Sequence, residues 1–164
     1  MTKITYGRVT AADIDAVMHI ESVNFSENEA LTRASMEERI NRIPDSFIVA
    51  RNEEGQVVGY VAGPVTEDRY LSDECFEHSD PNPLQGGFQK VISLSVDPEY
   101  QGLGIATELL LLLEKEARSK KRQGISLTCH DYLIPYYEKH GFINEGRSAS
   151  TFGGEIWYNM IQEF

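Results

Sequence analysis

Two glycines, Gly102 and Gly104, stand one residue apart where a leucine-rich segment begins, in the stretch DPEYQGLGIATELLLLL. The first N–H groups of a helix have no partner within the helix and carry about half a positive charge, so they attract anions. A glycine just before them has no Cβ to obstruct an approaching phosphate. The same glycines could equally form a tight turn that only starts a helix, so the flanking residues must decide.

Two common phosphate-binding loops do not match this stretch. A Walker loop fails because no Lys-Ser or Lys-Thr pair follows Gly104. A dinucleotide-binding G-x-G-x-x-G pattern fails at Thr107, and the residues DPEYQ separate the glycines from the preceding strand. The remaining chain is also too short to complete a doubly wound sheet. Both nucleotide-binding classes are therefore excluded.

The stretch resembles the acetyl-CoA signature of the GNAT N-acetyltransferases, Q/R-x-x-G-x-G/A, which here matches QGLGIA from Gln101 to Ala106. The lead-in V-x-P-x-Y ends at Tyr100, and LIPYYEKHGF resembles the closing Y-E-K-x-G-F segment of that family. Within the family, CHDYLIPYY is similar to the C-x-D-x-L-x-P-x-Y segment of the arylalkylamine (serotonin) N-acetyltransferases. The resemblance covers essentially the whole chain.

The resemblance implies a GNAT fold of the α/β (α+β) class in one domain, residues 1–164. We expect a mixed, mostly antiparallel sheet of about seven strands flanked by about four helices, with parallel, splayed strands before and after the glycine helix. The implied co-substrate is acetyl-CoA, with no metal. Its pantetheine arm would bind backbone groups of the strand before the glycines, and its pyrophosphate would bind N–H groups of the helix start. The predicted CoA-binding residues are Leu94, Ser95, Val96, Gln101, Gly102, Leu103, Gly104, Ile105, Ala106, Thr107 and His130.

His130 lies where many relatives carry an Asn that touches CoA, although a polar residue that only ends a strand fits the sequence equally well. The side chain of Gln101 offers an amide donor at a position where the family often has Arg. Phosphate recognition in this chain would therefore depend more on the backbone.

Acetyl transfer to an amine needs a neutral amine and an acid for the departing thiolate. A tyrosine, with a reference pKa of about 10, can give a proton to a thiolate, whereas an ionised carboxylate cannot. The resemblance assigns this role to Tyr137, and the alternative is that Tyr137 only packs between helix and sheet. The base is not identified, because the arylalkylamine branch has an H-x-H pair where this chain has Lys90 and Ile92. Deprotonation would then use water together with another residue, or only the small neutral fraction of the amine at working pH. The candidate residues, which the sequence does not rank, are Ser93, Glu21 and Asp131.

Hydrophobic periodicity and capping residues predict the elements that would position this site. A strand over KITYGRV precedes a helix capped by Thr10, and a second helix starts with a capping box at Ser35 and ends at Pro44. SFIVARNEEGQVVGYVAGPVT predicts an antiparallel hairpin, FQKVISLSV one strand, LGIATELLLLLEKEARSKK a long helix and GISLTC a strand. DYLIPYYEKHGF predicts a short helix, and GRSASTFGGEIWYNMIQ a closing hairpin. The buried face of the first helix should carry Ile14, Val17, Met18 and Val23.

Residues 67–87 are polar and predict a long loop, or a loop that holds a short helix. Its acidic side chains would attract a cationic acceptor, and Tyr70 and Phe76 could stack on an aromatic group or hold an alkyl chain. Four residues of this segment could be imagined as a metal site, but they lack established ligand spacing, and a solvated acidic loop is the preferred interpretation. Those four residues are Glu74, Glu77, His78 and Asp80.

The composition is that of a globular domain, with 41% hydrophobic and 25% charged residues among 164. No segment resembles a signal peptide or reaches the roughly 20 apolar residues that span a bilayer, so we expect a cytoplasmic protein. A net charge of −11 argues against nucleic acid and favours a cationic substrate. The two cysteines, Cys75 and Cys129, should be free thiols. Cys129 and His130 should point to opposite faces of a strand, which argues against a nucleophilic pair.

These observations predict an acyl-CoA-dependent N-acetyltransferase that transfers the acetyl group directly to the primary amine of a small cationic substrate, an arylalkylamine or a polyamine. Two alternatives stay open. The acceptor could be a protein N-terminus or lysine, which an open groove would favour. The domain could also bind acyl-CoA without turnover, which the missing histidine pair would favour. The sequence does not fix the acceptor, the base, the use of other acyl groups or the oligomeric state, for which a homodimer is one option.

Overall fold

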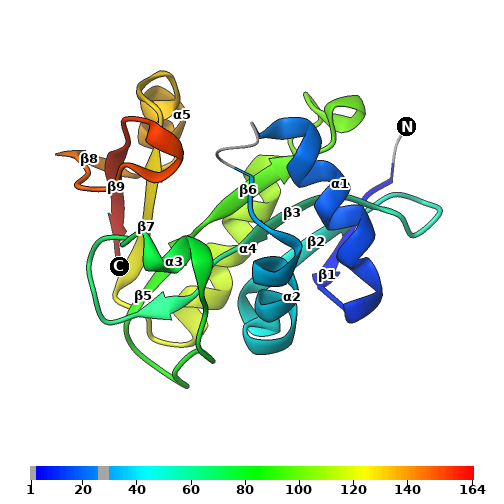
Figure 1. Cartoon of the computed structure of the whole chain (residues 1–164), viewed down its shortest axis with the longest axis horizontal. Coiled ribbons are helices and arrows are strands. Elements are labelled where there is room, and N and C mark those ends of the chain that lie inside the picture. The colour runs from blue at the N-terminus through cyan, green and yellow to red at the C-terminus, as the bar shows by residue number, and fades with distance from the viewer. Residues whose placement is uncertain (1–2, 26–29) are drawn as a thin grey trace.

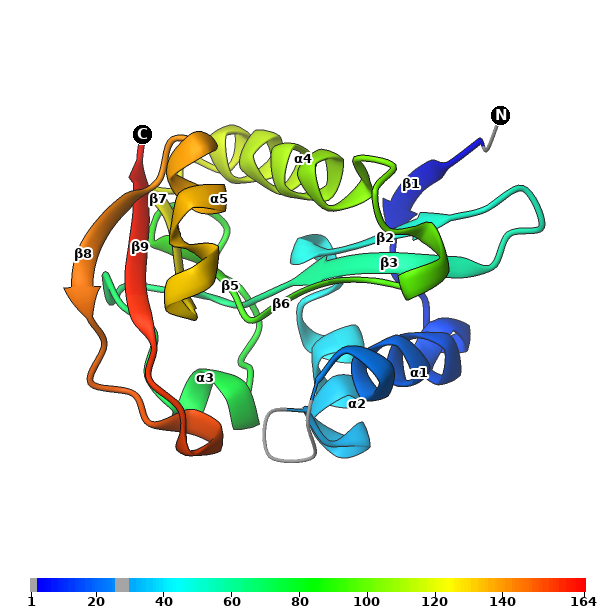
Figure 2. The same cartoon turned by 90° about the horizontal axis from the view of Figure 1, so that it is seen from above.

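The computed structural model describes residues 3–25 and 30–164, which form two sheets with helices on both sides (Figures 1 and 2). The first sheet has the strand order β1 (Thr5–Arg8), β2 (Phe47–Arg51), β3 (Val57–Ala62), β6 (Ser93–Val96). The second has the order β4 (Val65–Thr66), β5 (Phe88–Val91), β7 (Gly124–Cys129), β9 (Tyr158–Glu163), β8 (Ile143–Arg147). The helices are α1 (Ile14–Asn24), α2 (Arg33–Arg42), α3 (Glu74–Glu77), α4 (Ile105–Ser119) and α5 (Ile134–Lys139). This arrangement confirms the predicted mixed α/β fold.

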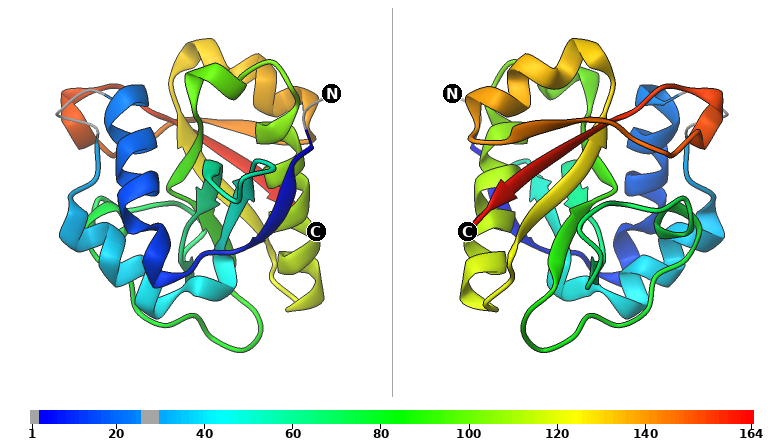
Figure 3. Two further views of the ribbon diagram at one scale, coloured as in Figure 1. Left: turned by 90° about the vertical axis from the view of Figure 1, so that its right-hand side faces the viewer. Right: turned by 90° about the vertical axis from the view of Figure 1, so that its left-hand side faces the viewer.

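Two apolar cores lie on opposite faces of the first sheet. Helix α4 covers one face and buries Leu109 and Leu113 completely, whereas α1 and α2 cover the other face with Val17 and Met36 (Figure 3). Burial of each such side chain stabilises the fold by roughly 1.5–3 kcal/mol. The helix that begins at the glycines is therefore held against the sheet along its length.

The strand predicted over residues 88–96 divides at Ile92 into β5 and β6, which belong to different sheets. β5 pairs in parallel with β7, whereas β6 pairs antiparallel with β3. At the division, the N–H of Ile92 donates to the carbonyl of Ala62 (2.8 Å), the residue that also faces Ser93. Two residues opposite one are the mark of a β-bulge, which bends a strand. As a result β6 turns away from β7, as the resemblance implied (Figures 1 and 2).

The chain crosses between the sheets a second time at Gly63, just after β3. A Cβ on Gly63 would lie 1.9 Å from the carbonyl oxygen of Lys90, so only glycine lets the two backbones approach. The N–H of Lys90 donates to the carbonyl of Pro64 (2.8 Å) beside this contact. The hairpin strand that was predicted to run through Thr66 therefore ends at Ala62, and its continuation, β4, joins the second sheet.

The starts of the first two helices differ in detail from the prediction. The N–H of Thr10 bonds to the Asp13 carboxylate (2.8 Å), as a capping box requires, but a short 3₁₀ turn (Ala11–Asp13) precedes α1. In α2 the Thr32 hydroxyl accepts from the Ser35 N–H (3.1 Å). Thr32 is thus the cap, and the prediction that Ser35 caps this helix is wrong because an earlier residue already satisfies the free N–H.

The buried face of α1 also differs from the prediction. Val23 is 48% exposed, because it lies about two thirds of a turn away from Val17. The buried stripe consists of Val17, Ile20 and Glu21. A carboxylate therefore takes the place in the core where an apolar residue was expected.

Candidate active site

Two adjoining cavities lie where β6 turns away from β7. The outer groove, of about 720 Å³, follows β6 and the start of α4. The inner cavity, of about 160 Å³, lies between the ends of β6 and β7 and the start of α5. Asn24, Leu94 and Leu133 line both. The two cavities thus lie next to each other and share part of their walls.

The glycines at the start of α4 line the outer groove. Gly102 and Gly104 have φ angles of 84° and 80°, in the left-handed region that favours glycine, and no atom lies within 4 Å of a Cβ built on either. Helical hydrogen bonding starts with the Glu108 N–H, which donates to the Gly104 carbonyl (3.1 Å). The preceding N–H groups have no partner within the helix and can hold an anionic group.

One backbone edge of β6 faces the outer groove. The Asp97 N–H donates to the Val58 carbonyl of β3 (2.8 Å). Because backbone groups alternate between the two edges of a strand, Ser95 also turns its N–H and carbonyl toward β3, whereas Leu94 and Val96 turn theirs toward the groove. The strand register thus favours Leu94 and Val96 over Ser95 for backbone contacts with the cofactor, and the contacts of all three residues stay predictions.

Side-chain amides shape the floor of the groove beside Val96. Its carbonyl accepts from the Nδ2 of Asn24 (2.8 Å) and the Nε2 of Gln101 (3.0 Å). The Nδ2 of Asn24 also donates to the Ser95 hydroxyl (2.6 Å). Gln101 thus connects the glycine loop to β6. Its amide, which was considered as a donor to the phosphate, already donates to the Val96 carbonyl.

The structure brings most of the predicted CoA-binding residues together. Leu103 lies outside both cavities and is 55% exposed. His130 lines the inner cavity, where its ring stacks between those of Tyr132 (5.2 Å) and Trp157 (4.4 Å). The predicted CoA-binding residues that line the outer groove are Leu94, Ser95, Val96, Gln101, Gly102, Gly104, Ile105, Ala106 and Thr107.

Glu21 brings a carboxylate into the inner cavity although it is only 1% exposed. Its oxygens accept from the Leu31 N–H (2.8 Å) and from the Tyr60 hydroxyl. Burial raises the pKa of Glu21 above its ordinary value, against the opposing effect of these hydrogen bonds and of the Arg39 charge. A carboxylate with a raised pKa is a better proton acceptor than an exposed one.

The structure ranks the three candidate bases. Ser93 lines the inner cavity beside Glu21, but a hydroxyl is a poor base without a partner. Asp131 is exposed and lies outside the lining. Lys90 is buried beneath the acidic loop, where its Nζ donates to the Asp68 carbonyl and burial lowers its pKa to about 8. Glu21 is thus the candidate that combines position and chemistry.

Tyr137 lines the inner cavity and is buried, with 7% of its surface exposed. Its ring packs edge-on against those of Tyr136 (5.1 Å) and Phe142 (5.7 Å). Burial raises the pKa of its phenol, so the hydroxyl keeps its proton at neutral pH. The neighbouring Cys129 is only 2% exposed, and burial raises its pKa to about 11, so it stays a neutral thiol and a poor nucleophile.

Two aromatic rings close another side of the inner cavity. One belongs to α3, and the other belongs to the short turn of residues 152–154. Phe76 and Phe152 stack with ring centroids 4.2 Å apart and planes inclined by 14°. Phe76 was a predicted acceptor contact, whereas nothing in the sequence singled out Phe152. Tyr70, the other predicted contact, is 40% exposed and donates its hydroxyl to Glu145 (2.7 Å), away from this cavity.

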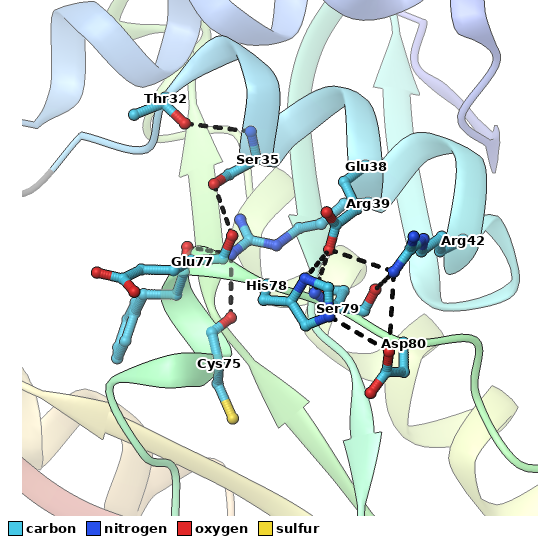
Figure 4. Close-up of polar contacts among 11 residues, drawn as sticks. Thr32, Ser35, Glu38, Arg39, Arg42, Cys75, Glu77, His78, Ser79 and Asp80 are labelled. Carbon is cyan, nitrogen blue, oxygen red and sulfur yellow. Dashed lines mark hydrogen bonds and ion pairs between the residues drawn. The ribbon is translucent and has the colours of Figure 1, made fainter.

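The acidic segment is a loop that contains the short helix α3, the second of the two predicted forms, and α2 holds it in place (Figure 4). The Nδ1 of His78 lies 2.8 Å from Glu38, and its Nε2 lies 3.3 Å from Asp80. Within the described residues no group of three His, Cys, Asp or Glu side chains could hold a metal ion. Among the acidic side chains of the loop, Asp80 contacts Arg42 of α2, whereas Asp73 accepts from the Ser150 hydroxyl.

Residues 14–142, which include the glycine loop, match the model of the acetyltransferase (GNAT) family. The chain belongs to the acetyltransferase (GNAT) family. This confirms the predicted family and the prediction of an acetyltransferase that uses a CoA thioester. The arylalkylamine branch and the individual site residues stay predictions.

Solved structures with a similar fold share little sequence with this chain, and no curated protein sequence matches it. The loading GNATL domain of CurA from Lyngbya majuscula has 12% identity and a TM-score of 0.81, with 98% of each chain covered. PaiA N-acetyltransferase from Thermoplasma acidophilum, solved with coenzyme A, has 16% identity and a TM-score of 0.70, with 99% of each chain covered. A NatC complex bound to Gag peptide and CoA has 16% identity and a TM-score of 0.77, with 99% of each chain covered. At these identities the likeness concerns the fold.

Gly104→Ala should weaken the binding of CoA about tenfold or more, because a Cβ at this φ is strained and occupies the approach to the helix N–H groups. Gly55→Ala is the matched control, since Gly55 has a φ of 79° and equally open surroundings but lies in the turn between β2 and β3. Both variants should lose about 1 kcal/mol of unfolding free energy in urea. Only Gly104→Ala should raise the Kd for CoA in calorimetry; an unchanged Kd would place the phosphate elsewhere.

Proposed function

We propose that this protein transfers the acetyl group of acetyl-CoA directly to the primary amine of a small substrate, an arylalkylamine or a polyamine-like cation, in the cytoplasm. One observation carries the proposal. The inner cavity holds a buried carboxylate, Glu21, and a buried phenol, Tyr137, and it adjoins the groove at the start of α4. A proton acceptor and a proton donor thus share one site that the thioester end of CoA can reach.

The outer groove suits the donor. The free N–H groups from Gly102 to Thr107 would hold the pyrophosphate, and the groove-facing backbone groups of Leu94 and the N–H of Val96 would pair with the pantetheine arm as an added strand. The Val96 carbonyl is held by Asn24 and Gln101 instead. The arm then leads along β6 into the inner cavity. This proposal explains why β6 must leave β7, because a closed ladder would have no edge for the ligand.

The chemistry divides between the two buried groups. Glu21 takes a proton from the substrate ammonium, and the neutral amine attacks the acetyl carbonyl to give a tetrahedral intermediate. Tyr137 then gives its proton to the CoA thiolate as the carbon–sulfur bond breaks, and the nitrogen of the new amide gives its surplus proton back to Tyr137. Glu21 releases its proton to solvent, so that one proton leaves in each cycle.

Size and charge favour an arylalkylamine among the proposed acceptors. An apolar cavity of about 150 Å³ holds one benzene molecule, and the inner cavity of about 160 Å³ is close to this size. Of the described residues that line it, Glu21 alone carries a carboxylate. A polyamine would bury a second ammonium without a counter-charge, which is costly. The stacked rings of Phe76 and Phe152 offer an apolar wall to an aromatic group.

A panel of acceptors in a thiol-release assay tests the function. With acetyl-CoA present, 2-phenylethylamine should raise the rate of free-thiol production well above the rate without amine. Spermidine and a short peptide with a free N-terminus should raise it less, because neither fits the inner cavity. Preference for the peptide would favour a protein acceptor. If no amine raises the rate although CoA binds, the domain binds acyl-CoA without turnover.

Glu21→Gln should lower kcat/KM by about 10²-fold or more, since a positioned base typically contributes 10²–10⁴-fold. Glu21 acts only when ionised and takes its proton from the substrate ammonium, so wild-type kcat/KM should fall on the acid side as Glu21 takes up a proton. The variant can use only the neutral amine, so its kcat/KM should keep rising with pH up to the pKa of the amine, without the wild-type acid limb. Glu37→Gln, an exposed change on α2, should leave the wild-type profile unchanged. A variant that keeps the wild-type acid limb would exclude Glu21 as the base.

Tyr137→Phe should lower kcat about 10²-fold or more while the Kd for CoA holds, because only the donated proton is lost. Tyr136→Phe is the neighbouring control. The Tyr136 hydroxyl lies 3.1 Å from the Thr107 hydroxyl at the outer groove, so this variant should affect CoA binding more than kcat. Steady-state kinetics and CoA titrations separate the two effects, and an unchanged kcat would remove Tyr137 from the mechanism.

A further inference from the structure

Arg39 on α2 is a buried cation that the proposed chemistry does not yet use. Its side chain is 1% exposed, and its Nη2 donates to the carbonyls of Cys75 (3.1 Å) and Phe76 (2.8 Å). Its Nε and Nη1 have no hydrogen-bond partner among the described residues. Burial lowers the pKa of Arg39 only to about 10, so the guanidinium stays charged at neutral pH. A permanent buried charge needs compensation from an opposite charge.

Glu21 supplies that opposite charge. Both side chains are 1% exposed and belong to the α1–α2 side of the first sheet, where Tyr60 bonds to Glu21. Of the charged and titratable groups that act on Arg39, Glu21 has the strongest effect, and the Arg39 charge in turn lowers the pKa of Glu21. Buried charges attract each other beyond contact distance, because no water screens them. The guanidinium therefore favours the ionised carboxylate.

The same guanidinium fixes one wall of the inner cavity. It binds two backbone carbonyls of α3, those of Cys75 and Phe76, and Phe76 lines the cavity. Figure 4 shows Arg39 on α2 together with Cys75 of α3. Arg42, one turn further along α2, also donates to this segment, at the Ser79 carbonyl (3.2 Å). Arg42 is 43% exposed, however, and its ion pairs are with Glu38 and Asp80. The two arginines thus share the anchoring of α3 but not the contact with the buried carboxylate.

We propose that Arg39 is a positioning residue for acetyl transfer: its charge keeps Glu21 ionised inside the protein, and its hydrogen bonds hold α3, with Phe76, against the inner cavity. The inference rests on the proposed role of Glu21 as base. The other polar or titratable groups that act on the pair are Tyr60 and Ser93 around Glu21, and Tyr60, Cys75 and Glu38 around Arg39. Burial keeps Tyr60 in its neutral form, because its pKa lies well above the ordinary value.

The pH profile of kcat/KM with 2-phenylethylamine tests the charge. Arg39→Gln keeps an amide donor but removes the charge, so its acid limb should move to higher pH by about one unit, a roughly tenfold loss on the acid side. Arg39→Lys keeps the charge and should leave the limb near that of the wild type, while KM for the amine rises as α3 loosens. Arg42→Gln, the matched control, should not move the limb. The proposal would be overturned if the acid limb of Arg39→Gln stayed at the wild-type pH. It would also be overturned if the acid limb of Arg39→Lys moved as far as that of Arg39→Gln.

A double-mutant cycle on stability tests the pair without catalysis. If the two buried charges compensate each other, Arg39→Gln alone leaves Glu21 unpaired, and adding Glu21→Gln should recover much of the lost melting temperature. This holds even where Arg39→Gln alone does not fold, since the double variant should then fold. Additive losses would overturn the proposal. Coupling together with an unchanged Glu21→Gln pH profile would instead contradict the proposed base and leave the charge pair intact.

Discussion

The change of partner at Ile92 governs the rest of this structure. A strand that stayed paired with β7 over its whole length would close the ladder and leave no backbone edge for a ligand. The bulge at Ile92 and the contact of Gly63 with the backbone of Lys90 hold the two sheets together on one side, so that β6 can leave β7 on the other. The N-terminus of α4, the edge of β6 and both cavities lie along this opening. The helices on the two faces of the first sheet keep it open, since α4 and α1 are each fixed by their own core.

The opening has an energetic consequence for the α1 side of the sheet. Glu21 occupies a buried place that an apolar side chain would fill at lower free energy, and Arg39 is buried with two nitrogens that lack partners among the described residues. Neither arrangement improves the packing. Both are understandable if the cavity needs a carboxylate whose pKa burial has raised, and if that carboxylate in turn needs a compensating charge. Stability is thus lost at the positions where the chemistry is proposed, as is common in active sites.

The sequence predicts those parts of the fold and site that depend on local patterns. The glycines of QGLGIA, the leucine stripe of α4 and the hairpin of β2 and β3 each follow from short-range rules. All three form where the patterns put them, except that the second hairpin strand ends at Ala62. Features that depend on contacts distant in the chain escape those rules. FQKVISLSV has no local signal for a break, because the break comes from pairing with two different sheets. Ser95 turns to β3 because of register, and Phe152 meets Phe76 only after the chain folds. Glu21 did carry a signal: it stands four residues after Val17, within the apolar stripe of its helix.

The proposed reaction must also bring together two substrates of opposite charge, although the net charge of the protein is −11. That net charge attracts an amine cation but repels the phosphates of CoA. Fixed dipoles solve this problem locally, because the N–H groups before Glu108 act at close range where lysine or arginine side chains are absent from the lining of the described groove. On the acceptor side, the Asp80 carboxylate of the acidic loop pairs with Arg42 of α2, and that of Asp73 accepts from the Ser150 hydroxyl. In the proposed mechanism it is the Glu21 carboxylate of the inner cavity that receives the amine. The general charge of the surface can guide an amine toward the protein, whereas in this proposal one paired charge inside it decides where the amine reacts.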